Sequence, residues 1–317
     1  MKLITPERFS PQHYAPEAIP AVVQSFAGAP NTLVAGSPGK IGLLELGFER
    51  VGERTELVRR FQKSPLQLMR PLYVDPARPD LPVAYVMSTG GGIVQADRLR
   101  LDVECGADTA VLVTTQAATR LYSMDSDFAT QLVHLRLGPR AWLEYLPESI
   151  IPHPRARFYQ RTSATVDPTA TLVIGEVVMA GRLARGERHQ YDVLALDTEV
   201  ADPDGTPFAV DRIRLCPVDS SVTGPGVWGD HTLIATLFVV SPLAPAAALA
   251  DALHAAVTSH SATYHTVAGV SVLPDDRGAW VRILGSDSPT LQLILRRAWD
   301  AARQTLLGVP APLLRKT

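Results

Sequence analysis

Residues 89–122 read Thr-Gly-Gly-Gly-Ile-Val-Gln-Ala-Asp-Arg-Leu-Arg-Leu-Asp-Val-Glu-Cys-Gly-Ala-Asp-Thr-Ala-Val-Leu-Val-Thr-Thr-Gln-Ala-Ala-Thr-Arg-Leu-Tyr, the clearest structural pattern in the chain. After the glycines, Leu99, Leu101, Val103 and Cys105 alternate with charged residues, which places the apolar groups on one face of a β-strand. Glycines 90–92 could bind a phosphate if a helix began directly after them, but a strand pattern follows instead. We therefore interpret the triplet as a turn or bulge that needs unusual backbone dihedral angles.

The same β pattern recurs from Ile41 onward, at about the 8–12-residue spacing that is typical of all-β folds. The expected strands are 41–50, 55–62, 82–89, 98–105, 109–115, 130–137, 141–146, 158–166, 171–179, 188–197, 207–215, 231–240, 266–273 and 279–284. Turn sequences at 202–205 and 275–278 separate several of them. No repeat of fixed length is visible, so a regular solenoid is not indicated, whereas a less regular β-helix is compatible with the pattern.

Two segments near the C-terminus have helical spacing instead. In 243–260 the apolar residues fall three or four positions apart, and Pro245 suits a first turn. In 289–307 a single apolar stripe follows Ser288, which can cap the helix, and Gly308 can end it. We expect both helices to pack on the sheet, whereas 308–317 could become ordered on a partner.

Composition excludes several classes of function. The formal net charge is −2, which gives no electrostatic footprint for nucleic acid or an anionic membrane. The two cysteines, Cys105 and Cys216, do not form a Cys-x-x-Cys pair, so a disulfide framework and a zinc cluster are not expected. The start turns polar too early for a signal peptide, and the apolar run 232–240 is too short to span a bilayer. We expect a cytoplasmic protein.

Candidate catalytic residues are few. Glu144 and Glu148 could act as paired carboxylates in a β-fold hydrolase or carbohydrate-binding protein, but four strand residues span about 13 Å, longer than such pairs require. Pro147 could bend the chain, so this alternative stays open. The sequence has no His-Glu-x-x-His, no Gly-x-Ser-x-Gly and no Walker lysine. The Gly-Arg-rich run 175–187 is either a solvated turn or a polar surface that binds a protein or passes a cation.

The order of several segments resembles the UreD family of urease accessory proteins, also called UreH, over roughly residues 41–315. The matching segments are 42–48, 64–73, 90–99, 114–122, 144–148 with 151–152, 175–176 with 181–187, and 307–310. The resemblance implies one mainly β, β-helix-like domain over 40–317, made of many short strands with two helices toward the C-terminus. Residues 1–39, rich in proline and alanine, then form an N-terminal extension.

The resemblance also implies a function. Such a chain would be a non-catalytic chaperone component that binds a UreF-like protein and, through it, a UreG-like GTPase. The complex would dock on apo-urease and deliver nickel in a GTP-dependent step. No cofactor would be tightly bound, because a conduit for nickel(II) needs weak, exchangeable oxygen or nitrogen ligands.

The candidate metal residues come from the matching motifs, and the candidate partner residues come from the C-terminal helix and tail. The acids expected along a transient nickel path are Asp97, Glu144, Glu148, Glu176 and Glu187. The residues expected to contact the UreF-like partner are Trp299, Arg303, Leu307 and Arg315. Ala96 departs from the family pattern, which usually has a second glycine before the aspartate, and indicates that this loop forms without glycine's freedom.

Overall fold

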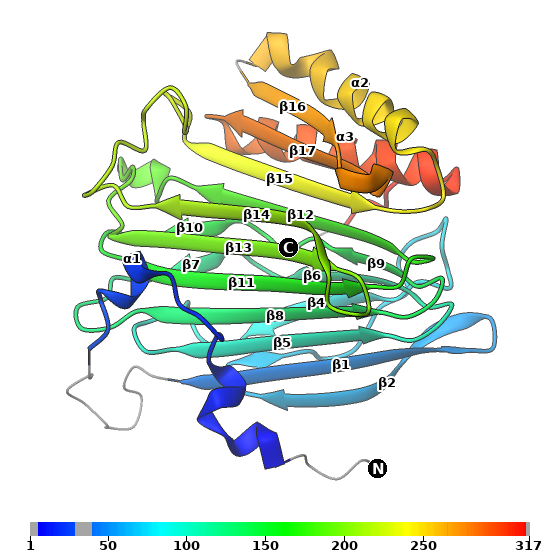
Figure 1. Ribbon diagram of the computed structural model, residues 1–317, viewed down its shortest axis with the longest axis horizontal. Coiled ribbons are helices and arrows are strands. Elements are labelled where there is room, and N and C mark those ends of the chain that lie inside the picture. Colours follow the sequence, from blue (N-terminus) through cyan, green and yellow to red (C-terminus); the bar gives the residue numbers. More distant parts are fainter. Residues whose placement is uncertain (1–5, 29–39, 265, 315–317) are drawn as a thin grey trace.

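The protein folds as a β-solenoid of about four turns, seen in a computed structural model that describes residues 6–28, 40–264 and 266–314 (Figure 1). Two large sheets face each other across the solenoid. The predicted mainly β, β-helix-like architecture with two helices toward the C-terminus is confirmed.

The first sheet contains seven strands in the order β14-β13-β11-β8-β5-β1-β2. Their bounds are β14 Pro207–Leu215, β13 Val193–Ala201, β11 Arg157–Val166, β8 Ala129–Leu137, β5 Arg98–Cys105, β1 Ile41–Val51 and β2 Arg54–Lys63. The second sheet runs β16-β17-β15-β12-β9-β6-β4-β3. Its strands are β16 Val267–Val272, β17 Gly278–Gly285, β15 Leu233–Val240, β12 Thr171–Met179, β9 Trp142–Tyr145, β6 Ala110–Thr115, β4 Val83–Ser88 and β3 Leu66–Gln67. Two further strands, β7 Thr119–Leu121 and β10 Ile150–Pro152, pair with each other, and β10 joins the second sheet by pairing with β12.

The chain winds by alternating between the two sheets, so strands of successive turns pair in parallel: β5 with β8, β8 with β11, and β6 with β9. Antiparallel pairs close both ends, with β1–β2 and β3–β4 at one end and β13–β14, β15–β17 and β16–β17 at the other. Because side chains alternate along each strand, one set from each sheet fills the interior. Leu99, Leu101 and Val103 belong to this inner core, as the alternation in β5 predicted.

Two long helices cover the outer face of the second sheet: α2, Ala246–Tyr264, and α3, Ser288–Leu307 (Figure 1). A second hydrophobic core lies between these helices and the sheet. The predicted cap of α3 needs a correction, because Asp287, not Ser288, accepts a hydrogen bond from the Thr290 backbone amide. Gly308 ends α3 in the left-handed conformation, as predicted.

Most expected strands lie within a few residues of their predicted bounds, but 188–197 was placed too early. β13 begins at Val193 and continues to Ala201. Residues before it form a turn in which His189 has a φ of 51° and its side chain meets Tyr191 and Trp228. The Arg-Gly-Glu-Arg-His sequence before β13 is therefore loop, because its polar side chains leave no alternating apolar face.

The triplet provides close packing at Gly92 and not unusual dihedral angles, which corrects the prediction made from the sequence. None of Gly90, Gly91 and Gly92 is among the glycines with positive φ. A Cβ at Gly92 would lie 2.6 Å from the Arg120 carbonyl oxygen, so only glycine lets the two segments approach. The left-handed residue of this loop is Ala96, with a φ of 61°, so the position does use the backbone freedom that a glycine would provide.

Part of the N-terminal extension packs on the outer face of the first sheet. Its short helix α1, Ala21–Gln24, places Val23 against Phe128 and Tyr159. Two 3₁₀ turns precede it, η1 Pro6–Phe9 and η2 Pro11–Tyr14. In the part of the chain that the structure describes, no helix is long and apolar enough to cross a membrane.

Candidate functional site

Four polar side chains gather between the two sheets, inside the solenoid. Gln160 on β11 donates a hydrogen bond of 2.8 Å to Glu176 Oε1 on β12. Asp211 on β14 forms an ion pair with Arg282 on β17. The strand registers place Glu176 beside Thr236 and Thr236 beside Arg282, so the two charged residues lie in one row of the second sheet. We call Gln160, Glu176, Asp211 and Arg282 the inner polar cluster.

The charges of this cluster do not balance. Two carboxylates face one guanidinium, and Arg282 hydrogen-bonds to Asp211. Burial, followed by repulsion from Asp211, raises the pKa of Glu176 to about 7. Burial also raises the pKa of Asp211, although Arg282 counteracts the effect. A carboxyl group with a pKa near 7, as Glu176 has, can exchange a proton near neutral pH.

Glu144 lies on the opposite face of the second sheet, under α3. Its carboxylate accepts a 3.0 Å hydrogen bond from the Trp299 indole, and Arg303 Nε lies 3.6 Å from the same oxygen. Arg303 also donates to Asp75 at 2.6 Å. All of these side chains are buried, and burial raises the pKa of Glu144 despite the nearby guanidinium. Glu144 therefore helps to hold α3 on the sheet, and no substrate can reach it alongside Glu148.

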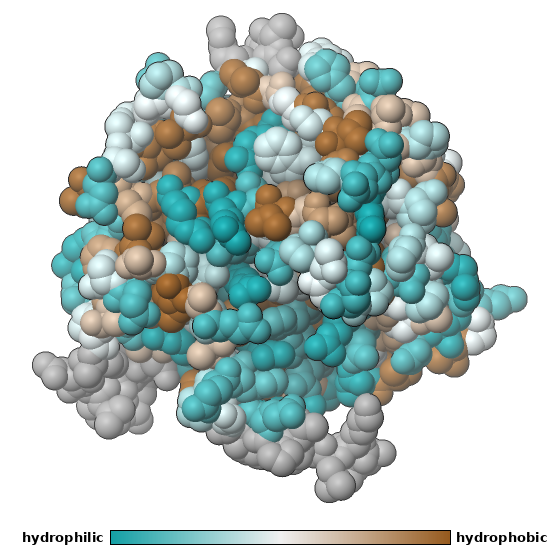
Figure 2. All heavy atoms as spheres, in the orientation of Figure 1, coloured by the Kyte–Doolittle hydropathy of each residue, from teal (hydrophilic) through white to brown (hydrophobic). Residues whose placement is uncertain are grey.

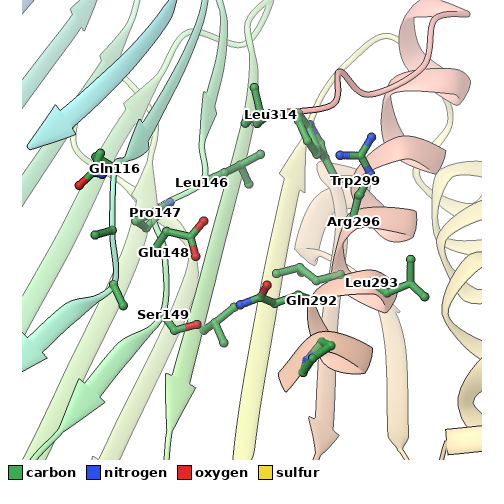
Figure 3. A pocket seen from close by; sticks show the side chains of 15 residues that line it. Gln116, Leu146, Pro147, Glu148, Ser149, Gln292, Leu293, Arg296, Trp299 and Leu314 are labelled. Atoms are coloured by element: carbon green, nitrogen blue, oxygen red, sulfur yellow. The ribbon is translucent and has the colours of Figure 1, made fainter. Parts of the chain in front are cut away.

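Glu148 lines a cleft of about 680 Å³ between the loop after β9 and the start of α3 (Figure 3). Leu146 and Pro147 lie on the sheet side of the cleft, and Leu293 and Arg296 lie on the helix side. The Glu148 backbone amide donates to the Thr115 hydroxyl, which fixes the loop. The cleft is partly apolar and carries both charge signs, features that suit a protein segment better than a tightly held metal ion.

The other two predicted acids have local partners. Asp97 is buried, and its carboxylate accepts hydrogen bonds from the backbone amides of Lys40 and Val94, at 2.9 and 3.0 Å. Glu187 pairs with Arg182, with a 2.6 Å contact to Nε, and this pairing holds the pKa of Glu187 below its usual range. The structure therefore does not gather the five predicted acids into one site. Among them, Glu176 belongs to the inner polar cluster.

The four residues predicted to contact the partner also do not form one surface among the described residues. Arg303 is fully buried, so a partner could touch it only if α3 moved. Trp299 is 5% exposed and borders the cleft of Figure 3. Leu307 is half-buried at the end of α3, and Arg315 lies outside the described residues. The sequence pattern of α3 could not reveal a buried arginine, because its acidic partner Asp75 is 228 positions away.

A group on the outer face of the first sheet has the composition of a metal site. His13, Glu45 and Asp102 each offer a ligand atom within 4.8 Å of the others. Arg8 already pairs with Glu45, and Arg100 binds both oxygens of Asp102. Figure 2 shows that hydrophilic side chains cover much of the lower part of this view. The group is therefore best explained as a set of ion pairs that fastens the N-terminal segment.

Comparisons with known proteins cover nearly the whole chain. The family described as UreD urease accessory protein matches residues 40–317. The chain is 49% identical over 294 residues to urease accessory protein UreD 2 of Streptomyces griseus subsp. griseus, covering 92% of this chain and 99% of the relative. It is 38% identical over 303 residues to urease accessory protein UreD of Haloarcula marismortui, covering 96% of each. It is 36% identical over 290 residues to urease accessory protein UreD 2 of Brucella suis biovar 1, covering 91% and 95%.

Proposed function

Because the chain belongs to the UreD family of urease accessory proteins, we propose that it is a non-catalytic scaffold that helps to load nickel into urease. In this proposal it binds a UreF-like protein and, through it, a UreG-like GTPase. The complex then docks on apo-urease, and nickel(II) is cargo in transit. The paired-carboxylate alternative is not favoured, because Glu144 is sealed beneath α3.

The inner polar cluster is the observation that supports nickel transit. A solenoid interior is expected to be apolar, and most of this one is. In this cluster two half-buried carboxylates share a single guanidinium, and a carboxylate that lacks a cationic partner is costly to remove from water. Oxygen ligands of this kind hold a first-row divalent cation weakly enough to release it, whereas thiolate or imidazole sites would retain it.

Glu176 is the first choice for a nickel-path residue. Its carboxyl pKa of about 7 means that it can exchange a proton for a metal ion at neutral pH. The roles of the other four acids in the path stay predictions: Asp97, Glu144, Glu148 and Glu187. Their contacts in the structure hold loops and helix α3 in place. Within the described part of the chain, Asp211 and Gln160 are two further candidates. Sequence reasoning had selected Glu176 but missed these two.

The test compares Glu176→Gln with Glu199→Gln in cells that produce urease and its other accessory proteins. Glu199 lies on the outer face of the first sheet, 3.6 Å from Arg161, and serves as the matched control. We expect Glu176→Gln to reduce the nickel content of urease at least severalfold while complex formation with the UreF-like protein persists. Equal nickel content in the two variants would remove Glu176 from the path.

The partner surface is proposed at the C-terminal end, on the cleft beside α3 and on the segment after Gly308. Leu314 borders the cleft, and Leu313 is 70% exposed. Deleting residues 308–317 should weaken capture of the UreF-like protein. A full-strength complex after the deletion would place the partner elsewhere.

A further inference from the structure

The second sheet ends at a strand with an open edge. β16 is the last strand in the order of this sheet, and among the described residues it pairs with β17 alone. Figure 1 shows β16 at the margin of the sheet, next to α2. The helix covers one face of the strand, but Val267 and Val272 stay 57% and 40% exposed. A further strand can therefore join the sheet at β16.

The backbone at this edge offers a row of hydrogen-bonding groups. The Leu273 amide donates to the Gly278 carbonyl at the end of the β16–β17 pair. Successive residues of an antiparallel strand direct their N–H and C=O groups to opposite sides. The groups of Ala268, Val270 and Val272 therefore point away from β17, and they have no backbone partner among the described residues. Such a row binds an extended strand, which carries matching groups at the same spacing.

β16 lacks the features that protect the other sheet edges. Proteins usually guard an edge strand with charged side chains, with proline or by keeping it short. In the first sheet, β2 is charged along its length, and β14 begins with Pro207 and carries three charged residues. At the other end of the second sheet, β3 has only two residues. Residues 266–273 read Thr-Val-Ala-Gly-Val-Ser-Val-Leu, with no charge and no proline. This edge is therefore built to pair.

Two copies of β16 match each other. A strand that pairs with its own copy about a two-fold axis runs antiparallel to it, so a charged strand would face its own charges. Residues 266–273 have no charge to repel. When Val270 lies opposite its own copy, Ala268 lies opposite Val272 of the second copy. In each of these pairs both N–H groups donate to the opposite carbonyl, so every group that points away from β17 gains a partner.

The helix beside β16 leaves space for a second copy. The two-fold axis of such a pair is perpendicular to the sheet, so the two copies of α2 lie on the same side of it. Between residues 246 and 259, the exposed residues of α2 include Ala247, Ala248 and Ala255, and none has a side chain larger than histidine. Helices pack with their axes about 8–10 Å apart, and small side chains at the contact favour the close end of this range.

We propose that β16 joins two copies of this chain into a two-fold dimer, in which the second sheets of both copies form one continuous sheet. The occupant of the open edge is thus β16 of the second copy. The contact is small and consists mainly of backbone hydrogen bonds, so the dimer should dissociate on dilution. Nickel and urease have no part in this pairing, which therefore stands or falls independently of the proposed function.

The first test is analytical ultracentrifugation of the full purified chain over a range of concentrations. The unaltered chain, of 34.2 kDa, should form a species of twice that mass. Val272→Pro should raise the dissociation constant of the dimer at least about tenfold, because proline lacks the outward N–H and its ring stands where the second strand would lie. The bonds to β17 do not use this N–H. Val272→Thr keeps the N–H and is the matched control, so it should dimerise like the unaltered chain.

Two outcomes of this test would overturn the proposal. An unaltered chain that keeps the single-chain mass at every concentration would leave the edge to a strand of a different protein. Dimers or larger assemblies that form equally well with Val272→Pro would show that another surface joins the copies. Circular dichroism of each variant shows whether it is folded.

The second test uses cross-linking and needs no proline. Val270→Cys places two cysteines opposite each other across the two-fold axis, with their Cα atoms about 5.5 Å apart, which a disulfide can span. Val272→Cys is the matched control, because its two copies would be four residues out of step, about 13 Å apart. The native Cys105 and Cys216 are buried. Under mild oxidation Val270→Cys should form a disulfide-linked dimer severalfold faster than Val272→Cys. Equal rates, or no link at Val270→Cys, would contradict the pairing.

Discussion

Replacing Arg303 by methionine should be among the most destabilising single changes outside the inner core. The Arg303 and Glu144 side chains are 0% exposed and that of Asp75 is 1% exposed, so the guanidinium balances acids that water cannot reach. Removing one partner of such a buried group costs about 3–5 kcal/mol. For a domain of this size each kcal/mol lowers the melting temperature by about 2–4 °C, so we expect a fall of roughly 6–20 °C.

The measurement is thermal and urea unfolding of the purified chain, followed by tryptophan fluorescence. Arg296→Met is the matched control on the same helix, because Arg296 donates to the neutral carbonyls of Ala311 and Pro312 and leaves no unpaired charge when removed. It should cost about 1–2 kcal/mol. The triple variant with Asp75→Asn and Glu144→Gln should recover most of the Arg303→Met loss. Equal costs for the two arginine variants, or no recovery, would refute the argument.

Three further predictions concern the turn segment and the inner polar cluster. Gly92→Ala should lower the free energy of unfolding in urea by about 1–3 kcal/mol, because the new Cβ would lie 2.6 Å from the Arg120 carbonyl oxygen. Gly90→Ala is the control and should cost clearly less, because the nearest atom to its Cβ would be 3.6 Å away. Similar costs for the two variants would contradict the packing argument. Ala96→Gly should stabilise the chain by about 0.5–1 kcal/mol in the same assay, because it relieves a φ of 61°, and a loss of stability would show that the angle carries little strain. The carboxyl pKa of Glu176 is raised from 4.5 to about 7 by folding. Between these two pH values the folded chain holds a proton that the unfolded chain releases. This group therefore makes the free energy of unfolding fall as pH rises from 4.5 to about 7. Glu176→Gln should remove up to about 3 kcal/mol of this fall, which unfolding at several pH values between 4 and 8 can measure; parallel pH profiles for the two chains would be inconsistent with the raised pKa.

Most strands and both long helices could be predicted from the sequence, because the patterns of neighbouring residues match the structure that each segment adopts. The alternation in β5 and the stripe and terminal glycine of α3 are properties of neighbouring residues, and each predicted its element within a few positions. The winding into a solenoid was not visible in the residues themselves, because the turns differ in length and no fixed repeat marks them. That part of the prediction came from the family resemblance, and the structure confirms it.

The candidate site was harder to predict because its members meet across the two sheets. Gln160 and Glu176 are 16 positions apart, whereas Asp211 and Arg282 are 71 apart. Motif matching selected Glu176 but had no reason to select the other three. The same reasoning treated Glu144 as a path residue, because its fixed partner Trp299 lies 155 positions further along the chain. Only the folded chain separates an acid that holds a helix from an acid in the inner polar cluster.

The central claim is that this chain helps urease to acquire nickel. The most direct measurement is the nickel content and activity of urease co-produced with its other accessory proteins, with and without this chain. The account predicts a large rise in both quantities when the chain is present. Unchanged nickel content and activity, with the chain shown to be soluble and abundant, would contradict it.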